Sequence, residues 1–174
     1  MTALTLTALL LARNTFNDPA FPEEGLRDFG FALSFAGIGV LLGAFLAPYG
    51  VSKFGRHRWI RFALFASSLC PLILAASATQ LALVTTALLV SIFGQSLKVT
   101  NDALVQSKID DYFRGRVFAV YDVVVNGVIV LGGLIAALLL PPSGVSFIVP
   151  LCVSTAYFLV ATLLLRPSVF PPVK

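Results

Sequence analysis

The chain has 174 residues, of which 58% are hydrophobic and 11% charged, and its formal net charge is +4. Soluble domains carry about 25% charged residues, so this composition excludes a soluble globular domain. Residues 62–97 and 123–165 contain no charged side chain. One membrane crossing requires about 20 residues, so each stretch is too long for a single crossing. Neither stretch alternates polar with apolar residues as the strands of a membrane barrel do. The sequence therefore predicts an all-α integral membrane protein in which each stretch forms two spans.

The first apolar segment, residues 1–12, is too short to cross a bilayer at about 1.5 Å per residue. A signal peptide is disfavoured, because no basic residue precedes the segment and Ala12-Arg13-Asn14 is a poor cleavage site. We interpret the segment as the second half of a span whose first half is absent. A tilted or interfacial segment is the alternative.

Five complete spans are predicted after a polar link at residues 13–28. Pro71 lies inside the second complete span, and the prolines and glycine of residues 141–144 form the turn before the last. We treat residues 1–174 as one six-helix unit. The five spans are residues 29–49, 59–76, 81–97, 117–140 and 145–165.

Basic residues are distributed unequally between the two sides of these spans. By the parity of the spans, ten of the twelve Lys and Arg residues fall on one side, which the positive-inside rule assigns to the cytoplasm. Both termini are then expected to be cytoplasmic, and the positive charge requires no nucleic-acid partner. The ten are Lys53, Arg56, Arg58, Arg61, Lys98, Lys108, Arg114, Arg116, Arg166 and Lys174.

Catalytic and metal-binding chemistry has little support in the sequence. The only histidine, His57, lies in a basic loop, and no span contains a cluster of His, Asp or Glu residues. No Ser, His and Asp set occurs at membrane depth. We therefore expect neither an enzyme nor a bound cofactor or metal.

The loop at residues 53–58 is short, basic and contains a glycine. It resembles the cytoplasmic loop of major facilitator superfamily transporters, whose motif is of the type Gly-x-x-x-Asp-Arg-x-Gly-Arg-Arg. Lys53, Gly55 and Arg56 match its Arg-x-Gly-Arg portion, while Ser52 and Pro48 occupy its aspartate and first glycine positions. Arg56 and Arg58 have two interpretations: they anchor the topology, or they also latch the cytoplasmic face through acidic groups of neighbouring helices.

A second motif lies at residues 105–118, where a short acidic stretch precedes Arg114-Gly115-Arg116-Val117. It resembles the loop before the eleventh helix in the exporter branch that includes enterobactin and macrolide efflux proteins. The order of the spans resembles helices eight to twelve of that family, with residues 1–12 as the end of helix seven. The resemblance therefore covers nearly the whole chain but only the carboxyl-terminal half of the family fold.

This resemblance implies proton-coupled efflux of small molecules across the bacterial cytoplasmic membrane. The family's cavity lies between two six-helix bundles, so transport would require the other half or a second copy of this chain. We therefore expect a truncated reading frame or fragment. The alternative is a small non-transporting membrane protein that acts as an assembly or interaction partner.

Three charged residues are candidates for coupling or for an ion pair between helices. Asp102 lies four residues after Lys98, so the two share one helix face. Asp122 lies about five residues inside the next span, where a carboxylate is costly unless it is paired or faces water. The interpretations left open for Asp122 are proton coupling and an interfacial ion pair with Lys98 or Arg116.

Polar and aromatic residues on three spans are placed near the central cavity by the resemblance to transporters whose eighth, tenth and eleventh helices line it. Packing or hydrogen bonding between helices is the alternative for each. Separately, the spacing of Gly39, Gly43 and Ala47 predicts a close helix contact. The cavity candidates are Ser34, Phe35, Ser91, Gln95, Tyr121 and Asn126.

Overall fold

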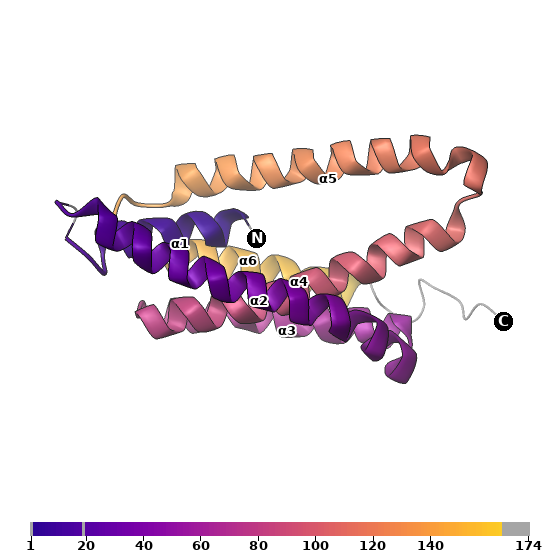
Figure 1. The fold of residues 1–174 in the computed structure, drawn as a ribbon, viewed down its shortest axis with the longest axis horizontal. Helices are drawn as coiled ribbons and strands as arrows, with labels where there is room; N and C mark the ends of the chain where they lie inside the picture. The colour runs from indigo at the N-terminus through magenta and orange to yellow at the C-terminus, as the bar shows by residue number, and fades with distance from the viewer. Residues whose placement is uncertain (1, 19, 165–174) are drawn as a thin grey trace.

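The computed structural model describes residues 2–18 and 20–164. Within this part of the chain the secondary structure is helical, without strands (Figure 1). The predicted all-helical fold is therefore confirmed. The elements are α1 (Thr2–Asn14), α2 (Pro22–Phe54), α3 (Arg56–Ala76), α4 (Gln80–Lys108), α5 (Asp111–Leu139), α6 (Ile148–Leu159) and the π-helical turn η1 (Val160–Leu164).

Four described helices are long and apolar enough to cross a membrane: α2, α3, α4 and residues Tyr112–Leu139 of α5. The apolar helix Ile148–Leu163 is shorter. It corresponds to the last predicted span, residues 145–165, whose final residue lies outside the described part of the chain, as do Arg166 and Lys174.

The helices extend beyond the apolar runs that predicted them. Helix α2 begins at Pro22, which is favourable in the first turn, and Glu23 and Glu24 suit the positive end of the helix dipole. Helix α4 likewise continues past Lys98 to Lys108. Charged residues end the apolar runs without ending the helices, because Lys and Glu are good helix formers. Membrane spans and helices therefore have different bounds in this chain.

Helices α2 and α4 pack closely along their length, and the contact is made by small residues of α2. A Cβ added to Gly39 would lie 2.5 Å from the Leu88 carbonyl oxygen, and one on Gly43 would clash with the Ile92 carbonyl oxygen. Ala47, on the same face, is 1% exposed. The predicted close contact through the GxxxG spacing is confirmed, and we call this contact the α2–α4 seam.

Helix α5 lies apart from the other long helices and runs along one side of the bundle (Figure 1). Its contacts are mainly with α1, and Val123 and Leu138 are 73% and 87% exposed. The loop after α5 is held against the end of α1, because Asn14 Nδ2 donates to the Pro142 carbonyl and Thr15 Oγ1 donates to the Ser143 carbonyl.

The connections between helices gather at two ends of the bundle. The α2–α3 and α4–α5 connections share one end, and the α1–α2, α3–α4 and α5–α6 connections share the other (Figure 1). The first end therefore contains both predicted basic motifs. The second contains Arg13 and Arg27 together with Asp18 and Asp28.

Candidate functional site

The connection between α2 and α3 is the single residue Gly55, whose φ of 81° suits glycine. Arg56 follows at once, is half-buried and lines a groove of about 360 Å³ between α2 and α4, where Ser52 and Thr100 are the polar neighbours. The Lys53 ammonium lies 5.7 Å from the ring centroids of Tyr49 and Phe54. Arg58 is exposed.

A buried hydrogen bond attaches this connection to α4. Trp59 Nε1 donates to Ser96 Oγ at 2.9 Å, and the indole ring lies where a side chain on Gly50 would be. The ring also stacks on Phe54, with centroids 6.3 Å apart. Sequence reasoning missed this contact, although a signal existed: Trp59 is the only tryptophan of the chain and directly follows the basic loop.

A polar cluster lies between α4 and α5 at the same end of the bundle. Lys98 Nζ lies 2.9 Å from Asp102 Oδ2, one helical turn away on α4. The Tyr121 hydroxyl of α5 donates to Asp102 Oδ1 at 3.3 Å. Asp102 therefore accepts hydrogen bonds from both helices. Its side chain is 26% exposed and that of Lys98 is 63% exposed, so solvent screens the ion pair.

Asp122 and Asn126 lie on the exposed surface of α5. Asn126 Nδ2 donates to the Asp122 backbone carbonyl at 2.8 Å. Among the described residues the Asp122 carboxylate forms no ion pair, while Lys98 pairs with Asp102 instead. Asp122 directly follows Tyr121 in the chain but is not part of the cluster formed by Lys98, Asp102 and Tyr121.

The second basic motif forms the first turns of α5. Arg114, Gly115 and Arg116 are all exposed, and they lie at the same end of the bundle as Gly55 (Figure 1). Their positive charge is therefore added to that of the α2–α3 connection.

The six residues predicted near a cavity are divided among three environments. Ser91 and Gln95 face the α2–α4 seam, since their Cβ atoms lie 2.9 and 3.0 Å from the positions of a Cβ on Gly39 and Gly43. Ser34 is exposed and donates to the Gly30 carbonyl, and Phe35 packs its ring 5.0 Å from that of Phe31. Tyr121 and Asn126 lie on the separate helix α5.

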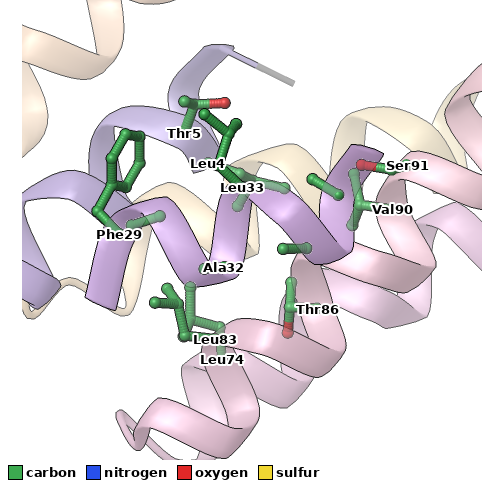
Figure 2. A pocket seen from close by; sticks show the side chains of 13 residues that line it. Leu4, Thr5, Phe29, Ala32, Leu33, Leu74, Leu83, Thr86, Val90 and Ser91 are labelled. Atoms are coloured by element: carbon green, nitrogen blue, oxygen red, sulfur yellow. The ribbon is translucent and has the colours of Figure 1, made fainter. Parts of the chain in front are cut away.

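A cavity of about 220 Å³ lies between α1, α2 and α4, and α3 closes its base (Figure 2). Its floor is buried, because Ala32, Leu74 and Leu83 are at most 5% exposed. Leu33 and Thr5 are exposed and border its opening. Of the six residues predicted to line a cavity, Ser91 lines this one.

No group of three or more His, Cys, Asp or Glu side chains that could bind a metal occurs among residues 2–18 and 20–164. The polar chemistry of this part of the chain therefore consists of the basic connections, the Asp102 cluster and the hydroxyls of the cavity.

Comparison with known proteins places these features in a family. The model of the Major Facilitator Superfamily matches residues 2–174. The chain is similar to an uncharacterised MFS-type transporter of Mycobacterium bovis and to one of Mycobacterium tuberculosis, each 31% identical over 143 residues. The match covers 80% of this chain and 31% of each relative, so the chain spans about a third of the length of these relatives. No solved structure matches the chain significantly.

Proposed function

Since the chain belongs to the Major Facilitator Superfamily, we propose that it forms one helical bundle of a transporter that exports small molecules in exchange for protons. The observation that carries this proposal is the family match, which extends over residues 2–174 and thus over every described helix. The similarity to MFS-type transporters agrees with it.

We place the bundle in the bacterial cytoplasmic membrane, with the end that contains Gly55 in the cytoplasm. Described basic residues from Lys53 to Arg61 and from Lys98 to Arg116 gather at that end, while acidic residues balance the charge at the other. We also propose that both termini are cytoplasmic, as the parity of the predicted spans implies.

Transport by alternating access needs a second bundle, because the substrate site lies at the midplane between two units that rock against each other. The matched region is about a third of each relative's length. We propose that the working unit pairs this bundle with the other half of the transporter or with a second copy of the chain. The exposed apolar faces of α2 and α5 are available for that contact or for lipid.

The charged residues receive distinct roles in this proposal. Asp122 is the proton-coupling residue, because its carboxylate is exposed and lacks an ion-pair partner among the described residues. Lys98, Asp102 and Tyr121 attach α4 to α5 near the end that we assign to the cytoplasm. Arg56 and Arg58 act as latches toward acidic groups of the second bundle.

The test is whole-cell efflux in the natural host, with the locus intact or with this coding region deleted. Accumulation of a panel of fluorescent small molecules is measured with and without a protonophore. We expect deletion to remove protonophore-sensitive efflux of at least one compound, and Asp122→Asn to remove the same component. Asp18→Asn, at the opposite end of the bundle, is the matched control. Unchanged efflux of every compound after deletion would contradict the transport proposal.

A non-transporting interaction partner is the second candidate. The observation that favours it is the exposed apolar face of α5, which contacts little of the bundle. Stoichiometric copurification with an unrelated membrane protein, combined with unchanged efflux after deletion, would support this function over transport.

A further inference from the structure

The proline inside α3 deprives one carbonyl of the helix of its usual donor. Pro71 has no N–H group, so it cannot bond the carbonyl of Ser67, four residues earlier. Ser67 is 2% exposed and Pro71 is fully buried, so this break in the hydrogen-bond ladder lies inside the bundle. There α3 packs against α4 and α6.

The helices beside α3 donate hydrogen bonds to two other carbonyls near this break. Ser154 Oγ of α6 donates to the Ser68 carbonyl. Thr86 Oγ1 of α4 donates to the Cys70 carbonyl at 3.4 Å. Side chains of neighbouring helices therefore serve the carbonyls on either side of the break, but these two donors do not bind the carbonyl of Ser67.

The hydroxyl of Ser67 is also buried, and it has no hydrogen-bond partner among the described residues. Other hydroxyls in these helices donate to a carbonyl one turn earlier, as Thr100 does to the Ser96 carbonyl at 2.8 Å. An unpaired buried hydroxyl costs free energy, so such groups are normally satisfied by protein or by ordered water. Ser67 thus contributes two buried polar groups at one point of α3, a hydroxyl and a carbonyl.

Burial and charge restrict what can bind these two groups. The carbonyl only accepts hydrogen bonds, so its partner must be a donor, whereas the hydroxyl can donate or accept. Residues 62–97 contain no charged side chain, so an ion would lose its hydration here without gaining a counter-ion. The nearby Ala63 and Leu64 are 0% and 8% exposed, so the ligand is enclosed and must be very small. Water meets these requirements, because it is neutral and both donates and accepts.

We propose that the break at Pro71 is a binding site for one buried water molecule. The water donates a hydrogen bond to the Ser67 carbonyl and forms a second one with the Ser67 hydroxyl; both groups belong to one residue, so one molecule reaches them. In a membrane-spanning helix, such a water replaces the bond that a proline removes. Neither Ser67 nor Pro71 lines the cavity between α1, α2 and α4, so the two sites are separate.

The first test uses the sign of a stability change, measured by unfolding the full chain with sodium dodecyl sulfate in mixed micelles. We expect Ser67→Ala to raise the ratio of unfolded to folded protein about three- to tenfold, because the water loses one hydrogen bond. An unpaired hydroxyl predicts the opposite sign, since its removal relieves the cost of burying it. Pro71→Ala restores an N–H donor for the carbonyl, so in that background the effect of Ser67→Ala should disappear or reverse.

The second test detects the water directly in the unsubstituted chain, so it stands even where a variant does not fold. X-ray pulses convert a bound water into a hydroxyl radical that oxidises the adjacent side chain, which mass spectrometry locates. We expect oxidation of Pro71 despite its burial, with ¹⁸O incorporated after exchange into H₂¹⁸O. Pro150 of α6 is also fully buried and is the matched internal control, which should stay unmodified. Ser67→Ala should reduce oxidation of Pro71 to the level of Pro150.

Three results would overturn the proposal. Oxidation of Pro71 no greater than that of Pro150 would exclude the water. A lower or unchanged ratio of unfolded to folded protein in Ser67→Ala would show that the hydroxyl is unpaired or bonds its own helix. A destabilisation by Ser67→Ala that persists in full beside Pro71→Ala would assign the effect to packing. None of these measurements involves transport, so the efflux proposal and the water site can fail separately.

Discussion

The helices of the α2–α4 seam and helix α5 are all apolar enough to cross a membrane, but they differ in how they are held. In the seam, backbone meets backbone, since a Cβ on Gly39 or Gly43 would clash with carbonyl oxygens of α4. On α5, Gly127 and Gly132 have open space around them. Small residues therefore create a close helix contact in one case and, at Gly127 and Gly132, leave open space in the other. Whether a glycine forms a close contact therefore depends on whether a second helix packs against it.

Helix α5 is held at a few places. In its first half Tyr121 bonds Asp102, in its second half Gly133 lies against α1, and the α5–α6 loop accepts hydrogen bonds from Asn14 and Thr15. Its central part exposes apolar side chains such as Ile129 and Leu131. Stability in this chain should therefore depend strongly on residues of the seam and the core and weakly on the middle of α5.

The largest expected difference is between two leucines. Leu83 is 2% exposed and Leu138 is 87% exposed. Leu83→Ala should lower the free energy of unfolding by about 2–5 kcal/mol, because it leaves a cavity that its neighbours cannot fill. Leu138→Ala should change it by less than about 0.5 kcal/mol, because lipid or detergent replaces the lost contacts. Unfolding by sodium dodecyl sulfate in mixed micelles measures both, and similar losses would contradict the comparison.

The seam can be tested with one methyl group. Gly43→Ala should destabilise the fold by about 1–3 kcal/mol, because the new Cβ meets the Ile92 carbonyl oxygen and main-chain atoms cannot move aside cheaply. Gly37→Ala, on the same helix, has no atom within 4 Å of the new Cβ. It should be neutral or should stabilise by up to about 1 kcal/mol through helix propensity. The same unfolding assay measures the two variants, and equal effects would show that the seam does not limit stability.

Much of the fold follows from the sequence, because apolar runs and glycine spacing are local signals. The helical membrane fold and the close contact at Gly39 and Gly43 could be predicted in this way. The helix ends could not, since α4 continues past the first charged residue, Lys98, as far as Lys108. Side chains that meet across helices have no local signature, which is why the bond from Trp59 to Ser96 was missed.

The candidate site could be predicted less well than the fold. Lys98 and Asp102 were recognisable because they are one turn apart on one helix, and their ion pair spans 2.9 Å. Tyr121 donates to the same carboxylate from another helix. This hydrogen bond could not be predicted, because it depends on how α4 and α5 are placed relative to each other. The position of Ser91 in a cavity wall likewise depends on how α1, α2 and α4 pack together.

The smallest expected effect concerns the attachment of α5 to α4. The Tyr121–Asp102 hydrogen bond is 3.3 Å long and half-exposed, so its net contribution should be about 0.5–1.5 kcal/mol. Tyr121→Phe keeps the ring and removes the hydroxyl. We expect hydrogen exchange in the first half of α5 to accelerate about two- to tenfold, while exchange at the α2–α4 seam stays unchanged.

Tyr112→Phe is the matched control, because Tyr112 is 80% exposed on the first turn of the same helix. It removes a hydroxyl without touching Asp102 and should leave the exchange rates of α5 unchanged. If Tyr121→Phe accelerated exchange in the seam as strongly as in α5, the two regions would open as one cooperative unit. Acceleration confined to α5 would instead show that this helix opens independently while the seam stays closed, as expected for a helix with few contacts to the other long helices.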